Sequence, residues 1–130
     1  MIRNVGIEVI EPKHMRYRTV GDWFFIGDKL VIQVADMKEW RYNLLVAIHE
    51  LIEVFLCTDA GISAKAVDKF DMTHEDDEDP GSHPKAPYHK QHVVAMGIEM
   101  LLSALLGVKW RPYEAAIEKA WSKTPRRKKK

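Results

Sequence analysis

His49, Glu50 and Glu53 are ionisable residues inside a stretch that is otherwise apolar, AIHELIEVFL at positions 47–56. Residues four apart on a helix project from the same face, so His49 and Glu53 can reach one point, with Glu50 beside them. A helix that is apolar all round is buried, and buried charges must be paired or must coordinate a metal. The spacing therefore predicts either a metal site, with His49 and Glu53 as ligands, or an internal charge network.

A second set of polar residues, His89, His92 and Glu99, recurs downstream at helical spacing within another apolar stretch. If this stripe faces the first helix, His92 supplies a nitrogen as the third ligand and leaves one position open to water. Glu99 is expected either to accept a hydrogen bond from a ligand or to act as a fourth ligand. His89, one turn earlier, is the substitute for His92.

The residue types restrict the metal that such a site would hold. The chain has a single cysteine, Cys57, which excludes zinc held by several thiolates. Zn²⁺ is expected at a site of two imidazoles and one carboxylate, and Mn²⁺ or Fe²⁺ is the alternative, because carboxylates favour harder ions. A two-metal carboxylate site is a further alternative, although the paired Glu-x-x-His elements of di-iron bundles are absent. That site would use His49, Glu50, Glu53, His92 and Glu99.

Strands are expected before the first of these helices. The first third of the chain is rich in β-branched and aromatic residues, and Gly21-Asp22 and Gly27-Asp28 are typical of hairpin turns. These features predict a small antiparallel β-meander. The predicted strands are 5–10, 15–20, 23–26 and 30–35.

Helical periodicity continues from there to near the C-terminus. Asp36 and Glu39 resemble a capping box, while Pro87 and Gly107 bound the second long helix. The predicted helices are about 37–57, 61–70, 87–107 and 111–123. A sheet followed by helices is an α+β fold, and the length predicts one domain over residues 1–122.

Charge is distributed unevenly along the chain. Six of the 20 basic residues lie in 123–130, so residues 1–122 carry a net charge of −5. The tail 123–130 is predicted to be disordered, as a solubilising end or, alternatively, as a contact with nucleic acid. The acidic stretch 71–79 leads into a segment rich in Pro and Gly, which predicts a long loop that could cover the site.

The composition also indicates a compartment. No apolar run approaches the ~20 residues that span a bilayer, so no membrane partner is expected. Glu8 interrupts the apolar residues near the N-terminus, where a signal peptide would need an unbroken run. The single Cys57 is consistent with a reducing environment. We therefore expect a cytoplasmic protein.

The predicted sheet and the HELIE motif together resemble the minimal core of the zincin metallopeptidases, over roughly residues 15–57. The motif of that family is His-Glu-x-x-His, and Glu53 stands here at the second histidine. The resemblance implies that His49 and Glu53 are metal ligands and that Glu50 is the general base, accepting a proton from metal-activated water as it attacks a carbonyl. It also implies a peptide or protein substrate, and an edge strand, 30–35, could bind an extended peptide.

Four segments, HELIE, DKFDM, PGSHPKAPYHKQH and GIEMLL, are in addition similar to short uncharacterised proteins encoded by bacteriophages. Two hypotheses follow from the sequence. The first is a metal-dependent hydrolase, leaning towards a peptidase. The second is a non-enzymatic interaction protein in which the metal or charge network only holds two helices together.

Overall fold

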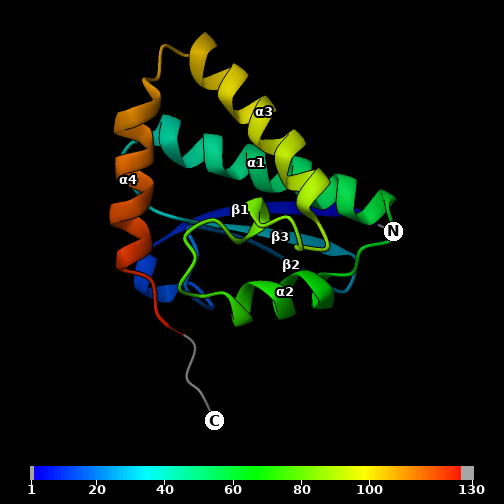
Figure 1. Ribbon diagram of the computed structural model, residues 1–130. Helices are drawn as coiled ribbons and strands as arrows, with labels where there is room; N and C mark the ends of the chain where they lie inside the picture. Colours follow the sequence, from blue (N-terminus) through cyan, green and yellow to red (C-terminus); the bar gives the residue numbers. More distant parts are fainter. Residues whose placement is uncertain (1, 127–130) are drawn as a thin grey trace.

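Three strands form a mixed sheet in the computed structural model, which describes residues 2–126 (Figure 1). They are β1 (Asn4–Ile10), β2 (Gly21–Ile26) and β3 (Lys29–Ala35), in the spatial order β1-β3-β2. β2 and β3 are antiparallel, whereas β1 runs parallel to β3. The strands precede the α-helices along the chain, so the predicted α+β class is confirmed.

The predicted antiparallel meander is wrong, because the segment 15–20 is not a strand and β1 joins the sheet in parallel. Met15 and Tyr17 are each 3% exposed, and Arg16 between them forms an ion pair of 2.7 Å with Asp22. The alternation of apolar and charged residues is therefore that of a loop with its apolar side chains in the core. The segment has the two-residue period of a strand but does not pair with another strand.

The two predicted hairpin turns have different outcomes. Gly27, with a φ of 60°, and Asp28 connect β2 to β3 as predicted. Gly21 and Asp22 instead begin β2. Because β3 is the central strand, the expectation that residues 30–35 form an edge is also wrong; the edges are β1 and β2.

All four predicted helices are present, with ends shifted by a few residues. They are α1 (Trp40–Asp59), α2 (Ala64–Thr73), α3 (His89–Leu105) and α4 (Trp110–Ser122), and short 3-10 turns lie at Pro12–His14 and Pro80–Ser82.

The start of α1 shows why one boundary moved. Asp36 accepts hydrogen bonds from the backbone N–H of Lys38 at 2.8 Å and from Asn43 Nδ2 at 2.9 Å. Lys38 has a φ of 61°, which a helix cannot continue through. Glu39 is therefore the N-cap, and its carboxylate accepts from the backbone N–H of Arg41.

The helices surround the sheet in a way that brings α1 and α3 together. α1 packs on β2 and β3, and α3 lies antiparallel beside α1 (Figure 1). The core is made by apolar residues of the sheet and of α1, α2 and α4, among them Leu30, Ile32, Leu45, Val54 and Val67. α1 is thus covered on two sides, by the sheet and by α3, which explains the apolar residues on those two sides.

None of the described helices is long and apolar enough to cross a bilayer. The predicted tail begins within the described residues, where Thr124 is 4% exposed and Arg126 forms an ion pair with Asp76 at 2.5 Å. Residues 127–130 of that tail lie outside the described residues.

Candidate metal centre

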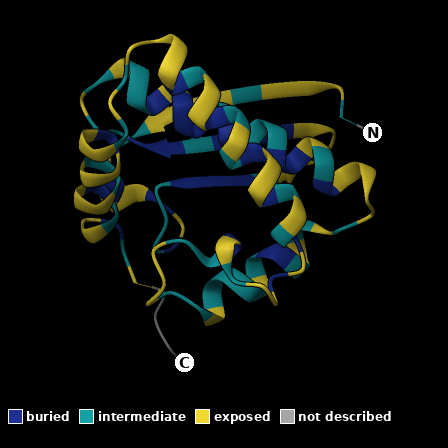
Figure 2. Cartoon of the chain, turned by 45° about the horizontal axis from the view of Figure 1, so that its top comes forward, coloured by how far each residue is buried: buried dark blue, intermediate teal, exposed yellow. Residues whose placement is uncertain are grey.

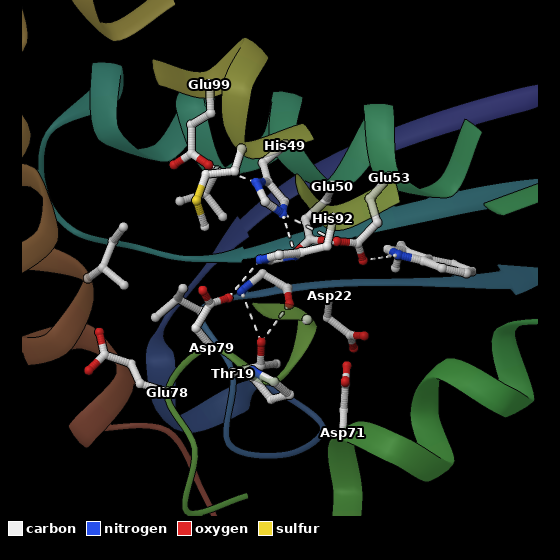
Figure 3. Close-up of a pocket in the computed structure, with 18 of the residues that line it drawn as sticks. Thr19, Asp22, His49, Glu50, Glu53, Asp71, Glu78, Asp79, His92 and Glu99 are labelled. Atoms are coloured by element: carbon white, nitrogen blue, oxygen red, sulfur yellow. Dashed lines mark hydrogen bonds and ion pairs between the residues drawn. The ribbon is translucent and has the colours of Figure 1, made fainter. Parts of the chain in front are cut away.

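Side chains from α1 and α3 converge at one buried point between the two helices (Figure 3). His49 and Glu53 lie one turn apart on α1, and His92 faces them from the first turn of α3. The three side chains are buried, and their potential ligand atoms lie within 4.8 Å of one another, so they form a group that could hold a metal ion. This is the trio of ligands that the sequence predicts.

The spacing of these atoms fits a small tetrahedral ion. His49 Nε2 lies 3.2 Å from both Glu53 Oε2 and His92 Nδ1, and His92 Nδ1 lies 3.0 Å from Glu53 Oε2. Ligands about 2.0–2.1 Å from a tetrahedral zinc ion are about 3.3 Å from one another, so the observed triangle is close to one face of that tetrahedron. One vertex of the tetrahedron then remains for a water molecule or a substrate atom.

The orientation of the imidazoles directs lone pairs at this point. His49 Nδ1 lies 2.7 Å from Glu99 Oε1, and a proton held there leaves Nε2 of a neutral ring as an acceptor. Two nitrogens and a carboxylate oxygen then face each other, an arrangement that needs either protons or a cation between them.

The pKa shifts of His49 and Glu53 also favour positive charge at the cluster. Burial opposes protonation of His49, but hydrogen bonds with Glu53 and Glu99 outweigh it and raise the pKa of His49 well above its usual range. Burial would raise the pKa of Glu53, but its contacts with His49 and His92 hold that pKa below the ordinary value. The cluster thus favours cations over neutral groups.

A second layer of residues orients the three side chains. Glu99 contacts the far nitrogen of His49, and its other oxygen accepts a hydrogen bond of 2.5 Å from the hydroxyl of Tyr113 on α4. Such carboxylate–imidazole pairs fix the ring and strengthen it as a ligand. Trp23 of β2 donates its indole N–H to Glu53 Oε1 at 3.2 Å, leaving Oε2 for the cluster.

The acidic loop reaches the opposite side of His92. Asp79 Oδ1 forms an ion pair of 2.8 Å with His92 Nε2. The loop backbone also comes close, because a Cβ built at Gly81 would lie only 2.4 Å from His92 Nδ1. The predicted role of the loop as a cover is consistent with this contact, since the segment 79–81 packs directly on a candidate ligand.

Glu50 projects from α1 beside the cluster and against the start of β2. A Cβ at Gly21 would lie 2.4 Å from Glu50 Oε1, so only glycine leaves room for the carboxyl group in this position. Burial, followed by the neighbouring charge of Glu53, raises the pKa of Glu50 well above its usual value. Glu50 as a whole is half-buried, but its carboxyl group lies against Gly21 and has a strong tendency to hold a proton next to the candidate ligands.

The cluster and Glu50 line a cavity of about 190 Å³. Its walls come from the loop before β2 and the start of that strand, from α1, α2 and α3, from the acidic loop and from the first half of α4. Carboxylates are numerous around it, while Trp23, Tyr88, Met96 and Trp110 supply apolar surface. The space is large enough for several water molecules or for one residue of a larger ligand.

The remaining predicted residue, His89, does not join the cluster. Its Nδ1 lies 3.0 Å from the backbone oxygen of Gly81, so the ring instead holds the covering loop. Three residues at the site were not anticipated from the sequence: Trp23, Asp79 and Tyr113. The indole N–H of an otherwise apolar buried tryptophan was a usable signal, because it requires a partner. Asp79 and Tyr113 contact His92 and Glu99 of α3, and no spacing in the sequence links them to that helix.

Comparison with protein-family models, with curated proteins and with solved structures found no match to this chain.

Proposed function

We propose that this protein is a zincin-like, metal-dependent hydrolase that acts on a peptide or protein substrate. The observation that carries the proposal is the triangle of His49 Nε2, Glu53 Oε2 and His92 Nδ1, with sides of 3.0 to 3.2 Å, on the wall of a cavity. Glu50 lies beside this triangle, where the resemblance to zincins puts a general base.

The roles of the residues follow from their surroundings. When bound, Zn²⁺ would act as a Lewis acid towards water and a carbonyl oxygen at the open position. Glu50 would accept a proton from that water and pass it to the leaving group. Its pKa is raised at this site, and a bound dication would lower the pKa of the carboxyl group again and so favour the carboxylate that a base requires.

The substrate class rests on the strand next to the cavity. β2 is an edge strand, and its first residues, Gly21, Asp22 and Trp23, line the cavity beside the cluster. An extended peptide can pair with the edge of a strand through main-chain hydrogen bonds. At the start of β2 such a peptide would have to replace Thr19, whose hydroxyl bonds both the N–H and the C=O of Gly21. β2 replaces the strand 30–35 that the sequence suggested for the same role.

A structural role is the second candidate, and a specific observation favours it. The ligands come from α1 and α3, and Tyr113 extends the hydrogen-bonded chain from Glu99 to α4. A metal bound here would join two helices, and the network would connect a third. In that case the protein is an interaction module that the metal, or the charge network alone, stabilises.

The first experiment is elemental analysis of protein purified without a polyhistidine tag. About one zinc per chain supports a single site, as does its loss from a His92→Ala variant. Two iron or manganese ions per chain would indicate the two-metal alternative instead. Protein that holds no metal after dialysis against zinc, manganese and ferrous ions would refute the proposed hydrolase and leave the charge network.

The second experiment separates the enzyme from the structural module. Glu50→Gln keeps the size of the side chain but removes the base, whereas Glu118→Gln makes the same change at an exposed position of α4. In an enzyme, Glu50→Gln keeps its metal and lowers cleavage of a peptide library by about 10²-fold or more, while Glu118→Gln cleaves like the wild type. Wild-type protein that binds metal, cleaves nothing in the library and unfolds on chelation would instead support the structural role.

A further inference from the structure

The outer surface of α1 and α3, on the side away from the sheet, is apolar and has no covering element among the described residues. On α3 the exposed residues after Lys90 are all apolar or small: Val93, Val94, Gly97, Met100, Leu101, Ala104 and Leu105. On α1 the residues on the same side are Leu44 and Phe55, which are exposed, and Ile48 and Ile52, which are half-buried. We call these eleven positions the outer apolar face.

The exposure of this face is large for a helical surface. Leu105 is 76% exposed, Phe55 66% and Leu101 62%. Figure 2 turns the α1–α3 side of the molecule towards the viewer and shows exposed stretches along α3. Surface helices of monomeric proteins present charged residues on the side away from the core. This pair of helices does not.

The charges of both helices are used inside the protein. Between Tyr42 and Cys57 the only ionisable side chains are those of His49, Glu50 and Glu53, and all three line the internal cavity. In α3 the same holds from Val93 to Leu105, where Glu99 is the one charged residue and is 6% exposed. The outer apolar face is therefore free of charge.

We propose that the outer apolar face is the interface of a homodimer, in which α1 and α3 pack against the same helices of a second copy. Seven large side chains of the face are 43% to 76% exposed, which amounts to roughly 700 Å² of surface; each partner contributes about 800 Å² to a stable interface of standard size. A two-fold interface brings the same patch of both copies together, so it must be self-complementary. An uncharged apolar patch meets that condition, because it contains no like charges to oppose each other.

Gly97 gives a second, independent indication. Glycine in the middle of a helix costs about 1 kcal/mol relative to alanine, so its presence calls for a reason. No close neighbour within the described chain supplies one, since a Cβ there would meet no described atom within 4 Å. Gly97 and Ala104 lie two turns apart on α3 and have little or no side chain. A helix of the second copy can therefore approach α3 closely at these two positions. Two antiparallel helices from each copy would form a four-helix bundle.

The test is the mass of the full-length protein in solution. Sedimentation equilibrium of the wild type at about 50 μM should give twice the 15.0 kDa of one chain. Leu101→Glu and Leu101→Lys should each weaken the dimer by about 100-fold or more, because a buried charge of either sign is unpaired at a symmetric apolar contact. Ala115→Glu, at an exposed position of α4, should remain dimeric.

Folding of the variants is checked by circular dichroism and thermal melting. Leu101 is 62% exposed and lies outside the core, so both variants should keep the helical spectrum of the wild type and unfold in one cooperative transition. A wild type that is monomeric at this concentration would overturn the proposal. So would Leu101 variants that stay dimeric, which would mean that another surface associates. If the monomeric wild type floated with phosphatidylcholine vesicles, the face would be assigned to a lipid surface and the homodimer abandoned.

Discussion

Gly21→Ala is a demanding test of the position assigned to Glu50. The new Cβ would lie 2.4 Å from Glu50 Oε1, 2.8 Å from Val46 Cγ1 and 2.9 Å from Glu50 Cγ. Ordinary contacts of a Cβ are 3.4–4 Å, so the carboxyl group has to move by about 1 Å. Overpacking of this kind lowers the unfolding free energy by about 1–3 kcal/mol. The lower conformational entropy of the unfolded alanine variant offsets about 0.4–1 kcal/mol of that loss.

The net loss of unfolding free energy should therefore be roughly 1–2 kcal/mol, measured by urea denaturation. Metal content should not change, because His49, Glu53 and His92 do not contact position 21. Hydrolysis should fall by about 10²-fold, as expected for a catalytic group that is misplaced by about 1 Å. The substitution thus tests the position of Glu50 by its effect on hydrolysis while the metal content shows that the ligands are intact.

Gly97→Ala is the matched control for the monomeric chain, because within one chain the same methyl group enters open space there. It should stabilise the protein by up to about 1 kcal/mol through helix propensity. Both variants are compared at about 1 μM, where association between chains contributes least to the measured stability. If Gly21→Ala unfolds at the same urea concentration as the wild type and cleaves substrate equally well, the argument from this close approach is refuted.

Three further changes give distinct outcomes. Gly81→Ala should displace His92 and weaken zinc binding by about tenfold or more in a chelator competition titration. Tyr113→Phe removes the hydroxyl that donates to Glu99, which should cost about 1–3 kcal/mol in urea denaturation and weaken zinc binding in the same titration. Asp71→Asn should make the unfolding free energy less dependent on pH between about 4 and 7, measured by urea denaturation at several pH values.

The sign of the last effect follows from the environment of Asp71. Burial, and then the charge of Glu53, raise its pKa to about 7, although the hydroxyls of Tyr17 and Tyr88 donate to it. The unfolded chain loses this proton near pH 4 and the folded protein only near pH 7, so stability falls as the pH rises between these values. The loss is up to roughly 4 kcal/mol by pH 7, at about 1.4 kcal/mol per pKa unit. Asp59→Asn, at an exposed position, should leave the pH dependence unchanged; a wild type without a decline in this window would contradict the prediction.

The parts of the site that could be predicted are those fixed by helical period. His49 and Glu53 share a face because they are four residues apart, and His92 and Glu99 share a face of α3 because they are seven apart. If both helices are buried, their polar faces are expected to pack against each other, because each then supplies partners for the other. The trio of His49, Glu53 and His92 was predictable for this reason.

What could not be predicted depends on contacts without a local period. The segment 15–20 alternates like a strand, but Tyr17 and Met15 are buried as parts of a loop. Asp79 reaches His92 from an acidic stretch whose composition is typical of a solvated loop. The parallel pairing of β1 with β3 likewise depends on the path of the whole chain, so it cannot be predicted from a short stretch of sequence.

That parallel pairing has a consequence for how the chain folds. β2 and β3 are joined by a two-residue turn, so their hairpin can form within microseconds from local contacts. β1 can pair only with β3, and only after the intervening loop and the whole hairpin have been brought back beside it. Loop closure of this kind delays non-local pairing. β1 should therefore join late and detach early, so that amides along the opposite edge of β3 exchange with solvent sooner than those that face β2.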